Sequence, residues 1–232
     1  MKILVCIPCL YGEVHTLEAI RSVHDRENVE LLLIDNGAEH KVVNLIWLYS
    51  QKEGVHVIKN PENIYVNPAW NQGIKFFLDR PEYSHIIIMN SDLIMQKDWS
   101  EVLLNRWANN PDEICIPIIH EDKNPPDVST RLQSVTEVHE GTPGVFITMN
   151  RKQAEMIFPI PESLKVWFGD QLIYEVLRKF YKTVIPDNLL CYHYWSQNVS
   201  KVERISEIIE EDKRQWELIG KNRVKELIEK FS

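Results

Sequence analysis

Short, uninterrupted apolar runs alternate with amphipathic segments along the first part of the chain. A short apolar run predicts a buried strand, and apolar residues three and four positions apart predict a helix packed against it. Because the runs carry few polar positions, we expect βαβ units and a mostly parallel sheet with helices on both faces. The predicted strands are Lys2–Pro8, Val29–Ile34, Val55–Lys59 and His85–Met89, and the predicted helices are Thr16–His24, Lys41–Gln51 and Pro68–Leu78.

The pattern becomes less regular after Trp99. A polar stretch with several prolines, His120–Thr142, is either a loop over a site or a partly disordered insertion. The other predicted elements are the helices Trp99–Trp107, Arg151–Ile157 and Asp170–Tyr181, and the strands Glu113–Ile119, Val145–Met149 and Lys182–Tyr194, the last broken by Pro186.

The last segment, Val202–Phe231, carries apolar residues at helical spacing and is interrupted around Gly220. Its polar face is rich in acidic residues as well as lysines, so we expect it to pack on its own domain or on a second copy, rather than on anionic lipid. The chain is therefore predicted to have an α/β, Rossmann-like domain, residues 1–200, and a C-terminal amphipathic helical tail, residues 201–232. Within the domain, residues 1–98 are predicted to form a doubly wound nucleotide-binding half, and residues 99–200 a second half.

Composition narrows the class of protein. The chain has 232 residues, 44% hydrophobic and 26% charged, with a formal net charge of −8 that argues against a general nucleic-acid binder. We see no apolar run of the roughly 20 residues needed to cross a bilayer, and no secretory signal. With four cysteines, this favours a reducing, cytoplasmic location. Any contact with a membrane would have to be peripheral, at its surface.

Polar residues follow the predicted strands at the edge where ligands bind in open α/β sheets. The first strand runs into Pro8-Cys9-Leu10-Tyr11, the second ends in Asp35-Asn36, and the fourth ends in Asn90-Ser91-Asp92. Asp35 could accept hydrogen bonds from a base or ribose, and Asp92 could hold a divalent cation at a diphosphate. The alternative for both is a turn residue that caps its own backbone.

Four segments in order, KILVCIPCLY, VELLLIDNGA, NPENIYVNPAWNQGI and SHIIIMNSDLIMQKDW, resemble the inverting family 2 glycosyltransferases of GT-A fold. The resemblance covers about residues 2–200. It implies a nucleotide-sugar donor (a UDP-, dTDP- or GDP-sugar) and a carbohydrate or other hydroxyl acceptor. It also implies that Pro8, Cys9, Leu10, Tyr11, Asp35 and Asn36 hold the nucleoside, and that Asn63 and Asn71 lie in the segment lining the donor pocket.

The resemblance places Asn90-Ser91-Asp92 at the Asp-x-Asp metal motif of the family. The first carboxylate is missing, as in the Asn-x-Asp form of rhamnosyltransferase-like members. Asp92 is the metal-binding position, and Asn90 would orient a ribose or a water. The expected cofactor is a divalent cation, Mn²⁺ or Mg²⁺.

The resemblance implies that residues 99–200 form the acceptor and catalytic half. Gly144 matches a strand that lies against the donor sugar, and Asp170 matches the general base at the start of a helix. Residue type and position alone equally permit Asp170 to be a helix N-cap. His193 matches a histidine that reaches metal or diphosphate, although a lone histidine in an apolar strand is often structural. Trp167 is a candidate for stacking on the acceptor.

Two rival functions remain open. Asn90 stands where the family has a carboxylate, and Gly169 where it usually has Glu. These two differences would fit a nucleotide-sugar-binding protein that has lost catalysis. A nucleotidyltransferase ranks last, because the segment after the first strand has no Lys or Arg for a phosphate loop. The spacing Cys6-x-x-Cys9 suggests redox or zinc chemistry, but Cys6 lies within a predicted strand and no second cysteine pair exists, so we interpret it as buried core.

Overall fold

The computed structural model describes residues 1–120, 136–137, 144–186, 189–194, 202 and 204–232. Its centre is a five-stranded sheet in the order β3-β2-β1-β4-β9, in which β9 alone is antiparallel to its neighbour. The mostly parallel sheet predicted from the sequence is confirmed. Its strands are β1 (Ile3–Cys9), β2 (Val29–Asn36), β3 (Val55–Asn60), β4 (His85–Met89) and β9 (Phe146–Asn150).

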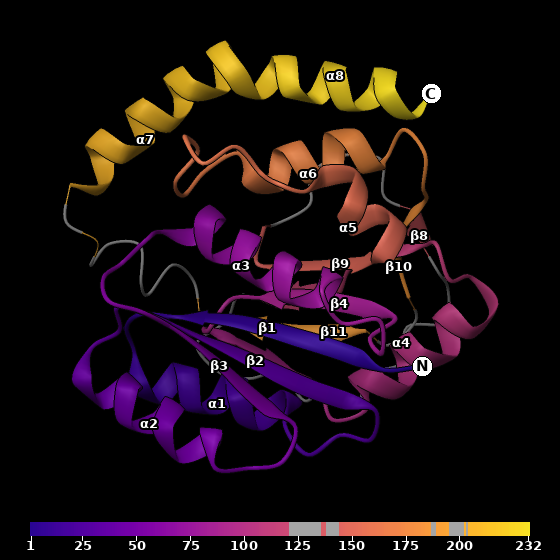
Figure 1. The fold of residues 1–232 in the computed structure, drawn as a ribbon. Coiled ribbons are helices and arrows are strands. Elements are labelled where there is room, and N and C mark those ends of the chain that lie inside the picture. The colour runs from indigo at the N-terminus through magenta and orange to yellow at the C-terminus, as the bar shows by residue number, and fades with distance from the viewer. Residues whose placement is uncertain (121–135, 138–143, 187–188, 195–201, 203) are drawn as a thin grey trace.

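Helices cover both faces of this sheet (Figure 1). Successive side chains of β1 enter opposite cores, with Leu4 and Cys6 in one and Ile3, Val5 and Ile7 in the other. This burial on both faces explains why the strands read as continuous apolar runs. The helices are α1 (Glu13–Val23), α2 (His40–Ser50) and α4 (Trp99–Asn109), whose side chains join one core, and α3 (Val66–Leu78), α5 (Arg151–Ile157) and α6 (Gly169–Leu177), whose side chains join the other.

Two small sheets flank the main one, and here the single strand predicted over Glu113–Ile119 is wrong. Pro117 separates two short strands that enter different sheets, and Pro186 separates another two in the same way. The small sheets have the orders β6-β10-β8 and β5-β11-β7. Their strands are β5 (Leu93–Met95), β6 (Ile114–Cys115), β7 (Ile118–His120), β8 (Thr136–Glu137), β10 (Thr183–Ile185) and β11 (Leu190–His193).

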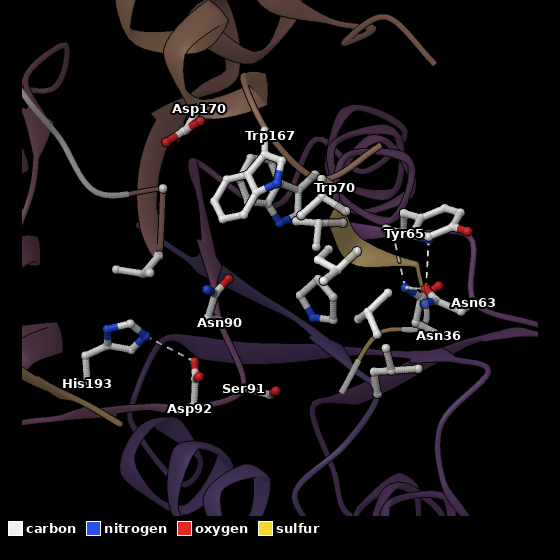
Figure 2. Close-up of a pocket in the computed structure, with 18 residues that line it drawn as sticks. Asn36, Asn63, Tyr65, Trp70, Asn90, Ser91, Asp92, Trp167, Asp170 and His193 are labelled. Carbon is white, nitrogen blue, oxygen red and sulfur yellow. Dashed lines mark hydrogen bonds and ion pairs between the residues drawn. The ribbon is translucent and has the colours of Figure 1, made fainter. Parts of the chain in front are cut away.

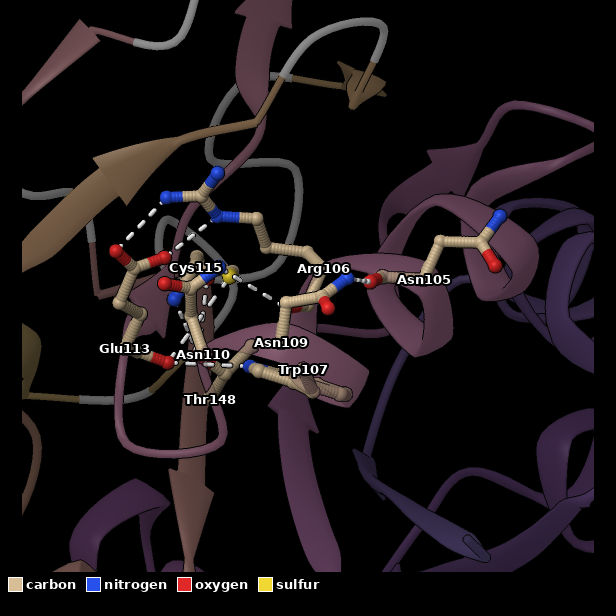
Figure 3. Close-up of polar contacts among 8 residues, drawn as sticks. All are labelled: Asn105, Arg106, Trp107, Asn109, Asn110, Glu113, Cys115 and Thr148. Carbon is tan, nitrogen blue, oxygen red and sulfur yellow. Dashed lines mark hydrogen bonds and ion pairs between the residues drawn. The ribbon is translucent and has the colours of Figure 1, made fainter.

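Polar contacts tie α4 to the start of β6 (Figure 3). Arg106 donates from Nε and Nη2 to the Glu113 carboxylate, at 2.5 and 2.8 Å. The Thr148 hydroxyl of β9 both accepts from the Cys115 N–H and donates to the Cys115 carbonyl, each at 2.9 Å. The first two bonds fix α4 to the residue before β6, and the other two join β6 to the main sheet.

The C-terminal tail lies across α6 and follows the outer side of the domain (Figure 1). It consists of α7 (Ile205–Gln215), a π-helical segment η2 (Trp216–Gly220) and α8 (Lys221–Phe231). The interruption predicted around Gly220 is therefore a widened turn within a continuous helical path. Trp216, Val224 and Leu227 are buried in the same core as α3 and α6, so the tail packs on its own chain.

The four cysteines are free thiols, all buried. Cys6 and Cys9 lie in different cores, which explains why they form no disulfide. Burial raises the pKa of the Cys6 thiol and, together with the nearby Cys6 and Asp35, that of Cys9, so both stay protonated. In the described residues, no helix is long and apolar enough to cross a membrane. The predicted stretch His120–Thr142 lies mostly outside the described residues.

Candidate active site

A cavity of about 230 Å³ opens where the parallel strands β1, β2 and β4 end. Figure 2 shows Asp170 and Trp167 entering it from one side, Asp92, Ser91 and His193 facing them, and Asn36, Asn63 and Tyr65 at one end. The convergence follows from the fold, because the carboxyl ends of parallel strands share one edge of the sheet. The residues that line the cavity are Pro8, Leu10, Asn36, Asn63, Tyr65, Val66, Trp70, Asn90, Ser91, Asp92, Gly144, Val145, Val166, Trp167, Asp170, His193, Val202 and Ile205.

Asp92 and His193 meet although they are far apart in sequence. Antiparallel pairing of β5 with β11 sets His193 opposite Leu93, the residue after Asp92. His193 Nε2 lies 3.5 Å from Asp92 Oδ1, and both side chains are almost fully buried. A carboxylate and an imidazole at this separation can act as two ligands of one divalent cation, with the remaining positions left to substrate oxygens and water. In the described part of the chain, no group of three His, Cys, Asp or Glu side chains surrounds a metal position.

Asp170 lies in the first turn of α6, and its carboxylate faces the cavity (Figure 2). Burial raises the pKa of this carboxyl, partly offset by backbone N–H groups of Gln171, Asp170 and Gly144. The N-cap position of α6 belongs to Phe168, so Asp170 accepts these bonds from within the helix. A partly buried carboxylate with a raised pKa, open to a cavity, is suited to accept a proton.

Gly144 makes the close approach to Asp170 feasible. A Cβ atom at Gly144 would lie 2.6 Å from Asp170 Oδ2 and 2.8 Å from its Cβ. The hydrogen bond from Asn90 N–H to the Val145 carbonyl, 2.9 Å, holds the same segment beside the end of β4. Gly144 therefore lies at the cavity wall, directly against the candidate base.

Asn36 organises the end of the cavity through its side-chain amide. Its Nδ2 donates to Asn63 Oδ1 at 3.1 Å and to the Tyr65 carbonyl at 3.2 Å. Its Oδ1 accepts from Asn60 Nδ2 and the Ile64 N–H, each at 3.2 Å. Because both ends of this amide are occupied, Asn36 holds the segment with Asn63 and Tyr65 in place.

Four predicted site residues lie outside the cavity lining. Cys9 is buried in the core, and Tyr11 follows the end of β1 beyond the lining residue Leu10. Asp35 Oδ1 accepts from the Ala38 N–H at 2.9 Å, as the capping alternative proposed. The Asn71 amide exchanges hydrogen bonds of 2.8 and 2.9 Å with the backbone of Ile160. Their roles in nucleoside or donor binding stay predictions.

Several lining residues were not singled out from the sequence. Tyr65, Val66 and Trp70, at the start of α3, lie within the segment Asn63–Gly73 that the family resemblance assigned to the donor pocket. Val202 and Ile205 come from the tail, and nothing in their local sequence links them to a site in the domain. Val66, Trp70, Val202 and Ile205 add apolar side chains to the lining of the cavity.

The family model described as glycosyl transferase family 2 matches residues 4–163, more than half of the chain. The chain belongs to glycosyl transferase family 2. Its general function is therefore glycosyl transfer, which the family supports ahead of nucleotidyl transfer. No curated protein sequence matches the chain.

Solved structures support the GT-A fold of this family member. S. aureus TarS 1–349 has a TM-score of 0.67 at 12% identity, over 96% of this chain and 74% of that one. The same fragment in complex with UDP-GlcNAc has a TM-score of 0.66 at 14% identity, over 90% of this chain and 64% of that one. GalNAc-T7 with UDP, GalNAc and Mn²⁺ has a TM-score of 0.62 at 14% identity, over 83% of this chain and 44% of that one. At these identities the likeness establishes the fold alone.

Proposed function

We propose that this chain is an inverting glycosyltransferase that uses a nucleoside diphosphate sugar, a divalent cation and Asp170 as the general base. The observation that carries the proposal is the cavity itself. It brings a partly buried carboxylate with a raised pKa, Asp170, to one side and the pair Asp92 and His193 to the facing side. The family's general reaction requires groups with these two capacities.

Asp92 and His193 are the residues that would hold the cation, Mn²⁺ or Mg²⁺. Their fit to this task rests on their burial, their 3.5 Å separation and their mixed oxygen and nitrogen donor set. Among the described residues that line the cavity there is no Lys or Arg, so a diphosphate would meet no cationic side chain there. When bound, the cation supplies the positive charge that stabilises the departing diphosphate.

The proposed step uses Asp170 to accept the proton of an acceptor hydroxyl. The acceptor oxygen bonds to the anomeric carbon, while the bond from that carbon to the β-phosphate oxygen breaks. The electron pair of the broken bond leaves with the nucleoside diphosphate. Attack from the side opposite the leaving group inverts the anomeric configuration, and no second protein acid is required.

The two ends of the cavity suggest how substrates are held. Asn36, Asn63 and Tyr65 would border the nucleoside, and Trp167, 37% exposed, offers a ring face for a carbohydrate acceptor. UDP-sugars are the first donors to test, because two of the similar folds were solved with UDP or UDP-GlcNAc. dTDP- and GDP-sugars complete the panel.

Donor binding is tested by thermal unfolding with UDP-, dTDP- and GDP-sugars, each with and without Mn²⁺. A ligand that binds only the folded state stabilises it by about 2.7 kcal/mol at 100 times its Kd. We expect a rise in Tm with one nucleotide class, dependent on Mn²⁺ and lost in Asp92→Asn. Asp79→Asn is the matched control, because Asp79 is exposed and pairs with Lys75 on α3.

Transfer is then followed as release of nucleoside diphosphate, with water and with a panel of hydroxyl acceptors. Turnover would support the proposal. Binding without hydrolysis or transfer would instead support a nucleotide-sugar-binding protein that has lost catalysis. Absence of any thermal shift would contradict the proposed donor pocket.

A further inference from the structure

We propose that Asp212, in the C-terminal tail, is a positioning residue of the active site: its carboxylate fixes the segment that carries Trp167 and leads into Asp170. This inference rests on the proposed function for its consequence in catalysis. The contacts that carry it involve residues after 163, where the family match ends, together with Asn67 of α3.

The Asp212 carboxylate accepts three consecutive backbone N–H groups. Oδ1 accepts from Lys165 at 2.8 Å, and Oδ2 accepts from Val166 at 2.7 Å and from Trp167 at 2.8 Å. Asp212 is fully buried, at 0% exposure. A buried carboxylate that accepts several charge-assisted hydrogen bonds is costly to disturb, so it fixes the backbone it binds.

Asn67 holds the same segment from the opposite direction. Its Nδ2 donates to the carbonyls of Leu164 and Trp167, at 3.2 and 3.1 Å, and its backbone N–H donates to the Lys165 carbonyl at 2.9 Å. The segment has no regular secondary structure, and buried backbone groups need partners. Two residues from distant helices supply most of them.

The tail also contacts the turn that precedes Asp170. Phe168 adopts a left-handed conformation, φ 65°, and its ring stacks on Trp216 of η2 with centroids 5.4 Å apart. Gly169 lies so close to Asn67 that a Cβ would come within 2.1 Å of Asn67 Oδ1. The backbone from Lys165 to Gly169 is thus held between α3 and the tail, and Trp167 and Asp170 leave it directly into the cavity.

Position matters here because the base and the stacking ring must meet the acceptor together. A displacement of about 1 Å caused by a change far from the reacting atoms can reduce turnover about 100-fold. Asp212→Asn keeps the size of the side chain but replaces one accepting oxygen with a donating NH₂ that faces N–H groups. We therefore expect it to release part of the segment without creating a cavity.

The test compares Asp212→Asn with Glu211→Gln, whose carboxylate is exposed and pairs with Arg214. The protein contains seven tryptophans. Labelling with 5-fluorotryptophan lets ¹⁹F NMR follow each ring, and the resonance that is missing in Trp167→Phe is assigned to Trp167. We expect Asp212→Asn to shift the Trp167 resonance and leave that of Trp47, which is 66% exposed on α2. Glu211→Gln should shift neither.

Kinetics supply the second readout. We expect Asp212→Asn to lower kcat for nucleoside diphosphate release about 100-fold, while the Kd for UDP with Mn²⁺ stays as in the wild type. A role in folding alone would lower Tm and leave both kcat and the Trp167 resonance of the folded protein unchanged. That result would overturn the proposal.

A second variant decides the matter if Asp212→Asn does not fold. Asn67→Ala removes the donor to the carbonyls of Leu164 and Trp167, and should shift the same resonance and lower kcat. An unshifted resonance with normal kcat would overturn the proposal. If the wild type turns over no donor, the proposed function fails, whereas the Trp167 resonance still reports whether Asp212 fixes the segment.

Discussion

At the scale of single residues, Asp170 illustrates the conflict between burial and charge. Burial favours the neutral carboxyl, so its pKa in the folded protein is raised. The stabilisation linked to this shift is present at low pH and is lost as pH rises through the folded pKa. Turnover that needs the ionised base should rise over the same interval. If Asp170 is the proposed base, the site gains it at the expense of stability.

Glu30, at the start of β2, has a pKa that is shifted in the opposite direction. Burial alone would raise its pKa, but hydrogen bonds from Lys2, Tyr83 and His56 and the charge of Lys2 lower it to about 2 from an ordinary 4.5. The Glu30 carboxylate lies 2.5 Å from Lys2 Nζ and 2.9 Å from His56 Nε2. Its ionised form is therefore preferred in the folded protein.

We predict that Glu30→Gln lowers the free energy of unfolding by about 1 kcal/mol at pH 7, because a partly exposed ion pair contributes modestly. A depressed pKa gives stability that is present above about pH 4.5 and is lost as pH falls toward 2. Urea unfolding at several pH values measures the free energy of unfolding of the variant and the wild type. A difference between variant and wild type that does not shrink below pH 4 would contradict this assignment. Because Glu30 lies at the other end of β2 from Asn36, donor binding should not change.

At the scale of elements, the π-helical segment η2 turns Trp216 into the domain core. Trp216 is 4% exposed and lies against Phe168, and a Cβ at Gly220 would meet its ring at 2.2 Å. We predict that Trp216→Ala costs about 3 to 5 kcal/mol, the usual range for a buried large aromatic residue. Leu218→Ala, at a 56% exposed position of the same segment, should change stability by less than about 0.5 kcal/mol. Equal urea midpoints for the two variants would show that the tail is not part of the core.

The main-sheet strands and their helices could be predicted because each has an apolar pattern complete within its own sequence. The short strands could not. β5 has three residues, and β6 and β7 read as one run because Pro117 separates the two strands without interrupting the apolar pattern. Their partners, β10 and β11, are selected by contacts across about 70 residues.

At the scale of the whole molecule, the cavity combines several distant parts of the chain, and three of them differ in how far the sequence reveals them. The strand ends contribute Asn36, Asn90 and Asp92, α6 contributes Asp170, and the tail contributes Val202 and Ile205. The first two parts carry motifs that could be found in the sequence. The contacts of Asp212 could not be found there. In the sequence it is one of several acidic residues of an amphipathic helix, and only the packing of the tail over α6 buries it.

We propose that Asp170 takes the proton of the acceptor, and one comparison tests this role most directly. Asp170→Asn keeps the shape of the side chain and removes the base, so kcat should fall by about 10² to 10⁴. Binding of the donor with Mn²⁺ should stay unchanged, and Asp79→Asn should behave as the wild type. The measurement is the rate of nucleoside diphosphate release at saturating donor for the three proteins. A normal rate in Asp170→Asn would contradict the account.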